Sequence, residues 1–279
     1  METPEYRVKL IQAESEQLGH YLHTLSADAW TQPSACQGWA VQDVVGHLIL
    51  CADLYTSVIS RGLQGNVAPL EGLPAAGTAN AASASTLLDQ LSVARRESLG
   101  AQLLPTFHAT NAHLCELLAG CYTQAWDTPC YHPAGLLSVR TLVDFRLGEV
   151  VMHGWDIRSS FDPGAGLSPS SLPAFLNVLR VAMGWAFWPG TQYATPVRYR
   201  FALTGSVPTQ LDIVVAENQA HLEPAGIVQA NVRCRCDTAT FVWLMYGRLP
   251  LPDALATGCL EMDGEAELIT AFAQWFRGV

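Results

Sequence analysis

The chain is long, apolar and acidic. It has 279 residues, of which 49% are hydrophobic and only 14% are charged, and its formal net charge is −10. This length and composition suffice for one large domain or two ordinary ones with packed cores. The 15 lysines and arginines form no basic run. Nucleic acids and anionic membranes are therefore poor candidate partners, because both bind clustered positive charge.

No targeting or membrane-spanning segment is predicted. The N-terminal METPEYRVKL has no apolar stretch behind a basic start, as a secretory signal would. The segment from Leu172 to Trp188 comes closest to a bilayer span but is interrupted by Arg180. We therefore expect a soluble, cytoplasmic protein. Its eight cysteines include no CxxC pair, and we expect them to be reduced thiols in buried or half-buried positions.

The first half of the chain has the apolar spacing of helices. Long helices are predicted over residues 5–26, 39–61, 85–118 (with a break near Pro105) and 139–158. Four such helices form a bundle whose facing side chains can build a metal site. Ala40 is the expected N-cap of the second helix. Residues 62–82 are rich in Gly, Pro and Ala, and we expect a loop there, either a free connector or a partial lid over a site.

The pattern changes in the second half. A helix over 171–188 is followed by alternating, β-branched segments, TPVRYRFALTG, QLDIVVAEN and IVQANVRCRCD, which predict strands. Helices return over 238–246 and 265–276. The fold class is therefore α+β. We predict a helical domain over 1–190, made of a bundle over about 5–160 and a connecting helix over 171–188, and a small α+β domain over 191–279.

Three residues form a potential ligand set for a divalent metal. Glu149 and His153 are four residues apart and would share one face of a helix. If the helix carrying His47 packs against that face, two imidazoles and one carboxylate meet, as in catalytic zinc sites. All three lie among apolar residues, where an unpaired buried carboxylate is costly and a metal would offset that cost. The alternative is hydrogen-bonded core histidines and an ordinary Glu-xxx-His pair.

Two motifs carry a family resemblance. GWAVQDVVGHL and RLGEVVMHGWDI resemble the mycothiol-dependent maleylpyruvate isomerase family. Later segments, FVWLMYGRLP and ALATGCLEMDGEAELITAFAQWF, are similar to its C-terminal domain. The resemblance implies an N-terminal DinB-like four-helix bundle and a small C-terminal sterol-carrier-like α+β domain. It also implies that His47, Glu149 and His153 bind Zn²⁺ or another divalent metal.

The resemblance suggests roles for further residues. Trp39 and Trp155 match family aromatics and are expected to pack structurally. Asp156 matches the Asp of the HGWDI motif and either orients a ligand histidine or pairs structurally with Arg158 or a backbone donor. Asp43, one turn before His47, has the same two interpretations.

Arg248, in the YGR motif, is the best match for an arginine that holds a substrate carboxylate; a fold-stabilising role is the alternative. Asp43 and Arg248 are thus the candidate catalytic residues.

These observations favour a thiol-dependent enzyme. The metal would activate a low-molecular-weight thiol, for which the resemblance implies mycothiol or a similar compound. The thiol would then be transferred to a small electrophilic substrate or catalyse its cis-trans isomerisation. A monomer or homodimer is expected. Two alternatives stay open: a metal-dependent hydrolase using zinc-bound water, with Asp43 as a conceivable base, and a non-catalytic protein that binds apolar ligands.

Overall fold

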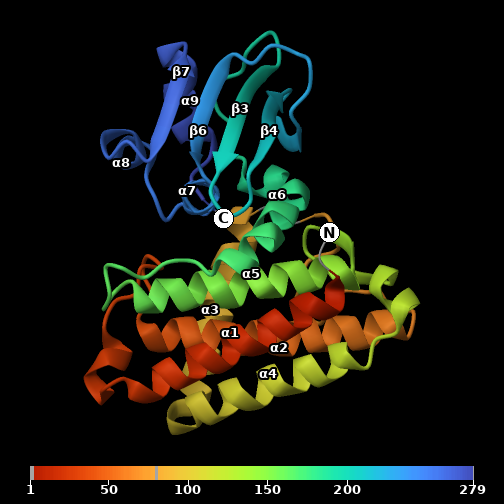
Figure 1. The fold of residues 1–279 in the computed structure, drawn as a ribbon. Helices are drawn as coiled ribbons and strands as arrows, with labels where there is room; N and C mark the ends of the chain where they lie inside the picture. Colours follow the sequence, from red (N-terminus) through yellow and green to blue (C-terminus); the bar gives the residue numbers. More distant parts are fainter. Residues whose placement is uncertain (1–2, 79–80, 279) are drawn as a thin grey trace. The chain divides into compact units, whose positions relative to one another are not determined.

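The computed structural model describes residues 3–78 and 81–278. The chain divides into two compact units, Met1–Ala174 and Phe175–Val279 (Figure 1). Helix α6, Leu172–Ala186, begins at the end of the first unit and lies mostly in the second. The sequence-based domain boundary after residue 190 lies beyond this helix and stays a prediction. The α+β class is confirmed, with helices in the N-terminal part and a sheet in the C-terminal part.

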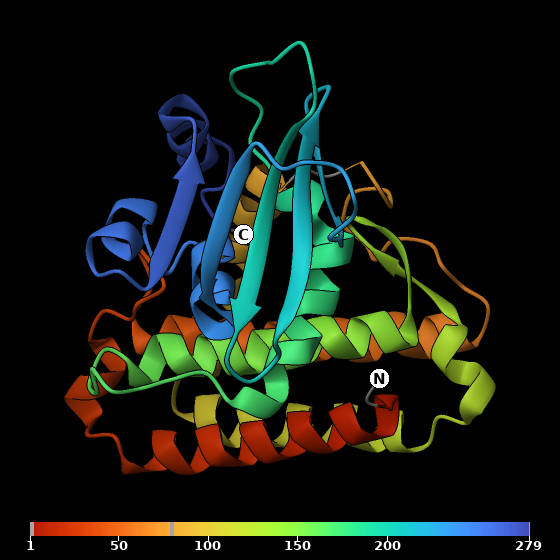
Figure 2. The ribbon, with the colours of Figure 1, turned by 45° about the horizontal axis from the view of Figure 1, so that its top comes forward.

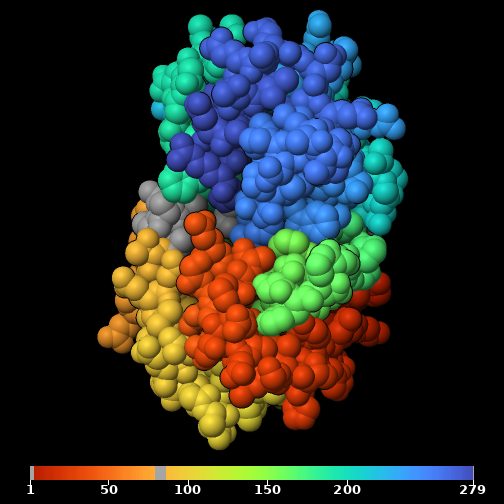
Figure 3. Space-filling view, turned by 90° about the vertical axis from the view of Figure 1, so that its left-hand side faces the viewer, coloured from red at the N-terminus to blue at the C-terminus, as the bar shows by residue number. Residues whose placement is uncertain are grey.

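The first unit is built around four helices. They are α1 (Pro4–Thr24), α2 (Val41–Leu63), α4 (Leu103–Ala119) and α5 (Val139–Arg158). Helices α1 and α2 each pack against both α4 and α5, and α3 (Ala81–Leu99) packs along α2. Segments distant in sequence thus lie side by side, as the neighbouring red, yellow and green atoms of this unit show in Figure 3. Short 3-10 helices span Ala27–Thr31, Gly100–Gln102, Thr123–Asp127 and Pro169–Ser171.

The helix predicted over 85–118, with a break near Pro105, is two helices, α3 and α4. Helix α3 ends at Leu99, and Gly100 has a positive φ of 48°, a conformation that glycine adopts without the steric cost of a side chain. The break therefore lies at Gly100 and not at Pro105. Pro105 instead lies in the first turn of α4, where its missing N–H costs no helical hydrogen bond.

Helix α2 begins where the sequence predicts. Ala40 is its N-cap, and the backbone N–H of Ala40 donates to Asp43 Oδ2 at 3.0 Å. Among the described helices α2 is long and apolar enough to cross a membrane by length and composition, which corrects the expectation that no such stretch exists. In the most apolar window of α2, 61% is buried inside the protein. A core helix passes the same test, so this finding is weak evidence for a membrane.

The segment after α2 is held to the bundle. Tyr131 Oη donates to the Pro74 carbonyl at 2.6 Å, and the Gly77 N–H donates to the Pro133 carbonyl at 2.9 Å. Both partners belong to a hairpin of β1 (Pro129–His132) and β2 (Gly135–Ser138), which was not predicted. The described part of the 62–82 loop is thus an anchored loop and not a free connector; positions 79–80 lie outside the described residues.

The second unit contains a five-stranded sheet in the order β5-β4-β3-β6-β7. Its strands are β3 (Val197–Thr204), β4 (Thr209–Ala216), β5 (Gln219–Pro224), β6 (Val232–Asp237) and β7 (Leu260–Gly264). Strands β3 and β6 run parallel and the other neighbours antiparallel (Figure 2). The remaining helices are α7 (Thr238–Met245), α8 (Leu251–Ala256) and α9 (Ala266–Trp275). Buried aromatics such as Phe201, Phe241 and Phe272 fill one core with α6.

Helices α2 and α3 pack closely at Gly46, so a larger residue at this position tests their packing. A Cβ at Gly46 would lie 2.8 Å from the Ser92 carbonyl oxygen and 2.9 Å from Arg96 Cβ. Gly46→Ala is therefore expected to destabilise the protein by about 1–3 kcal/mol in urea unfolding, despite a gain of about 1 kcal/mol in helix propensity.

Gly154→Ala is the matched control, because its Cβ would meet only Leu18 side-chain atoms at 3.7 Å or more. The control variant should be neutral or slightly stabilised. Equal unfolding free energies for the two variants would contradict the α2–α3 packing described here.

Candidate metal centre

The three predicted ligands meet inside the first unit. His47 Nε2 lies 2.9 Å from Glu149 Oε2, and His153 Nε2 lies 3.3 Å from the same oxygen. The two imidazole centroids are 4.7 Å apart. Both histidine side chains are largely buried, and that of Glu149 is 27% exposed. One carboxylate oxygen therefore lies between two ring nitrogens.

Helix geometry and apolar packing explain this meeting. Glu149 and His153 project from one face of α5, since they are four residues apart. On α2, His47 is flanked by fully buried Val44 and Leu48, which share a core with Val150 of α5. Burying these apolar faces holds the two helices together and brings the polar side chains to their interface.

Each histidine is oriented by a second contact on its other nitrogen. Asp156, fully buried, lies with Oδ2 2.9 Å from His153 Nδ1. Ser92 Oγ lies 3.2 Å from His47 Nδ1 and donates its own hydrogen to the Leu88 carbonyl at 2.6 Å. Ser92 therefore accepts from His47 Nδ1–H, and Asp156 accepts from His153 Nδ1–H. In the neutral imidazoles this places both free lone pairs on Nε2, beside Glu149.

This donor set fits a divalent metal. Two imidazole Nε2 atoms and one carboxylate oxygen are the protein ligands of a common class of catalytic zinc site. Metal-ligating histidines characteristically donate their second N–H to a carboxylate or another oxygen, as both do here. Asp156 thus makes the contact with His153 that the ligand-orienting interpretation of its motif requires.

The three groups shift one another's pKa values. Burial alone would lower the pKa of His47, but Cys51 and Glu149 raise it to about 9. Burial also acts to lower the pKa of His153, but hydrogen bonds with Asp156 and Glu149 raise it to about 9. Burial acts to raise the pKa of Glu149, but hydrogen bonds from both histidines hold it well below its usual value. Without a metal, both histidines therefore carry protons at neutral pH and pair with Glu149.

Three contacts of the site were not predicted. The Trp39 ring lies 4.9 Å from the His47 ring and is stacked at 6.1 Å on that of His153, so Trp39 covers both imidazoles and is part of the site. Ser92 orients His47, and Cys51 lies beside it. Of these three residues, only Cys51 is spaced from His47 as helical neighbours are, four residues apart, so its proximity to His47 was predictable.

Trp155 has the structural role expected, donating from Nε1 to the Ala165 carbonyl.

The two candidate catalytic residues lie outside this cluster. Asp43 uses both carboxylate oxygens structurally, with Oδ2 on the Ala40 N–H and Oδ1 accepting from Arg96 Nε at 3.0 Å. Arg248 follows α7 in the second unit, where its Nη1 donates to the Tyr246 carbonyl at 2.9 Å. A catalytic role for either residue stays a prediction.

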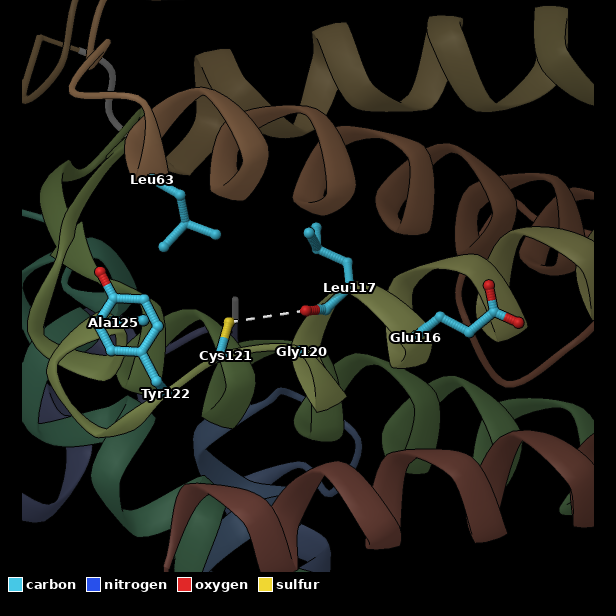
Figure 4. A pocket seen from close by; sticks show the side chains of 7 residues that line it. All are labelled: Leu63, Glu116, Leu117, Gly120, Cys121, Tyr122 and Ala125. Carbon is cyan, nitrogen blue, oxygen red and sulfur yellow. Dashed lines mark hydrogen bonds between the residues drawn. The ribbon is translucent and has the colours of Figure 1, made fainter.

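A separate hollow lies at the C-terminal ends of α2 and α4. Its volume is about 350 Å³, and its lining comprises Leu63, Glu116, Leu117, Gly120, Cys121, Tyr122 and Ala125. Figure 4 shows the Cys121 thiol directed at the Leu117 carbonyl, to which it donates at 3.7 Å. No residue of the His47, Glu149 and His153 cluster lines this hollow, so it is distinct from the metal centre.

Comparison with known proteins agrees with this architecture. The family described as "Mycothiol maleylpyruvate isomerase N-terminal domain" matches residues 11–158, which is more than half of the chain and includes His47, Glu149 and His153. The chain belongs to this family.

Among solved structures, the crystal structure of the mycothiol-dependent maleylpyruvate isomerase superposes with a TM-score of 0.58 at 16% identity, covering 88% of this chain and 90% of that one. A histidine-to-alanine mutant of that enzyme gives the same values. At this identity the likeness shows the fold alone. No curated protein matches the sequence.

The raised histidine pKa values predict how metal affinity depends on pH. A proton on Nε2 must leave before that nitrogen can bind a cation. With folded pKa values of about 9, the apparent affinity for zinc should increase from pH 7 to pH 9 and level off above. Competition against a chromophoric chelator would measure it. An affinity independent of pH over this range would contradict protonated histidines in the metal-free site.

The Asp156 contact predicts a second effect. Asp156→Asn keeps the side-chain shape but removes the carboxylate that fixes the His153 tautomer. We expect the affinity for zinc to fall about 10–100-fold. Ser160→Ala is the matched control, because its hydroxyl contacts only the Asp156 carbonyl and not a histidine. Unchanged affinity in Asp156→Asn would show that Asp156 serves packing alone.

Proposed function

We propose that this protein is a metal-dependent enzyme that activates a low-molecular-weight thiol for reaction with a small electrophilic substrate. The observation that carries the proposal is the meeting of His47 Nε2 and His153 Nε2 at one oxygen of Glu149. Membership of a family described by mycothiol and maleylpyruvate isomerase supports mycothiol, or a similar thiol, as the cosubstrate.

His47, Glu149 and His153 would hold the metal, zinc being the ion that the donor set favours. A bound divalent metal supplies the positive charge that converts a thiol to its nucleophilic thiolate at neutral pH. Asp156 and Ser92 hold the Nδ1 protons of the two histidines and so keep both Nε2 atoms directed inward. Trp39 covers the two rings on one side and restricts access of water there.

The reactive thiolate would add to an electrophilic carbon of the substrate. With a cis-alkene acid, addition, rotation about the resulting single bond and elimination give the trans isomer and return the thiol. With a substrate that carries a leaving group, the new carbon–sulfur bond persists, and the reaction is S-transfer. Both outcomes require the same residues of the first unit. We propose that Arg248 of the second unit holds a substrate carboxylate.

Hydrolysis is the less favoured activity. It requires a general base beside the metal, and Asp43 was the conceivable one. Both oxygens of Asp43 already accept hydrogen bonds, from Arg96 and from the Ala40 N–H. A role as base would break the cap of α2, the helix that carries His47.

Removing either histidine should abolish metal binding. We expect about one zinc per chain in the untagged wild-type protein and none in His47→Ala or His153→Ala, measured by plasma mass spectrometry. His20→Ala, at an exposed position of α1, is the matched control and should keep its zinc. Glu149→Gln should weaken binding less than loss of a histidine does. Normal zinc in both histidine variants would exclude these ligands.

Thiol dependence distinguishes the remaining functions. Turnover of electrophilic substrates that requires both added thiol and zinc is the expected result. Zinc-dependent turnover without thiol would favour a hydrolase, and retention of apolar ligands without metal or turnover would favour a binding protein. Product mass distinguishes the first two results, and mass spectrometry of the ligand that copurifies with the protein detects the third.

A further inference from the structure

Cys51 lies directly against the proposed metal ligands. It is on α2, one turn after His47, and is only 6% exposed. Its Sγ lies 3.4 Å from His47 Nε2, the same nitrogen that faces Glu149, and 3.9 Å from Nδ1. The ligand atoms of His47, Cys51 and Glu149 all lie within 4.8 Å of one another. The thiol thus lies beside the imidazole ring, closer to Nε2 than to Nδ1.

These separations match the edges of a zinc coordination polyhedron. For tetrahedral zinc, with Zn–N of about 2.0–2.1 Å and Zn–S of about 2.3 Å, the nitrogen–sulfur edge is about 3.5 Å. The Cys51 Sγ to His47 Nε2 distance is 3.4 Å. The sulfur lies beside the imidazole ring and off the axis of the Nε2 lone pair, since it is almost as close to Nδ1 as to Nε2. A rotation of the Cys51 side chain, without a movement of α2, would therefore be needed to bring the sulfur onto a metal bound by His47 and Glu149.

We propose that Cys51 is an additional, internal ligand of the metal centre. This inference rests on the proposed function, because it requires that His47, Glu149 and His153 bind a metal. On binding, the Cys51 S–H bond breaks, a sulfur–metal bond forms and the proton leaves to solvent; nothing is oxidised or reduced. Before substrate binds, the Cys51 thiolate then occupies a coordination position of the metal. An external thiol binds the metal either by replacing the Cys51 sulfur or by adding as a further ligand.

A buried cation supports this assignment. Arg146, one turn before Glu149 on α5, is only 1% exposed. Its Nη2 donates to Asn111 Oδ1 at 2.7 Å, whereas Nε and Nη1 have no hydrogen-bond partner among the described residues. Burial lowers the pKa of Arg146, and Cys51 is the strongest of the groups that oppose this shift. A Cys51 thiolate would add negative charge to that of Glu149 near this buried guanidinium.

The other cysteine beside the site provides a matched control. Cys36 groups with His153 and Asp156, and Asp156 occupies the Nδ1 side of that imidazole. Cys36 is not grouped with His47 or Glu149, so we expect it to contribute no sulfur to a metal held by them. The two thiols near the centre thus belong to different ligand groups.

Cobalt substitution tests the proposal without an activity assay. The full-length protein and the variants Cys51→Ser, Cys51→Ala and Cys36→Ser would be loaded with Co²⁺ in buffer free of thiols. We expect an intense near-ultraviolet thiolate-to-cobalt band in wild type and Cys36→Ser, and its loss in both Cys51 variants. X-ray absorption of the zinc-loaded wild type should show one sulfur at about 2.3 Å.

The outcomes separate this proposal from the broader one. Bound cobalt without the thiolate band in wild type, or a band that persists without Cys51, would overturn the role of Cys51 and leave the three-ligand site intact. Failure of the wild type to bind any divalent metal would overturn both proposals. Circular dichroism of each variant verifies the fold, and the two Cys51 substitutions guard against a folding defect specific to one of them.

Discussion

The first unit is organised by one carboxylate held between two imidazoles. Glu149 is removed from most solvent, and burying its charge alone would be strongly unfavourable. Hydrogen bonds with His47 and His153 offset that cost. They also join α2 to α5 at one point, so the interhelical packing and the chemistry of the site depend on the same contact. A metal at this place would replace the hydrogen bonds with coordination by the same three atoms.

A polar layer in the bundle supports this contact. Asn111 of α4 accepts from Ser15 of α1 and from Arg146 of α5, and its amide donates to the Phe107 carbonyl. Because hydrogen bonds are directional, these contacts fix the rotation of the three helices about their axes more specifically than apolar packing alone would. Arg146 is one turn from Glu149, so a rotation of α5 that displaced the carboxylate would also break this layer.

The sequence predicted which three side chains would meet better than it predicted their surroundings. His47, Glu149 and His153 were identified because a helical spacing and two family motifs name them. Ser92 was not identified, because α3 has no period that indicates which residue faces His47. Trp39 was identified from its motif but with a structural role, because nothing in the loop before α2 indicates that its ring covers the two imidazoles. The break at Gly100 was assigned to Pro105 because proline interrupts helices more often. The strands β5 and β7 were missed because they are short and each has only two larger apolar or alanine positions on one face, Ala220 and Leu222 in β5 and Leu260 and Met262 in β7.

Helix α5 carries Arg146, Glu149, His153 and Asp156 within about three turns. The polar groups of the site are therefore largely one rigid body, and their mutual geometry does not depend on loop conformation. Local unfolding of α5 would displace Glu149, His153, Asp156 and Arg146 together. A bound metal would in turn stabilise α2 and α5 against local unfolding, and it would stabilise these two helices more than any other element. Amide hydrogens of these two helices, more than of the rest of the chain, would then exchange more slowly with solvent as metal occupancy rises.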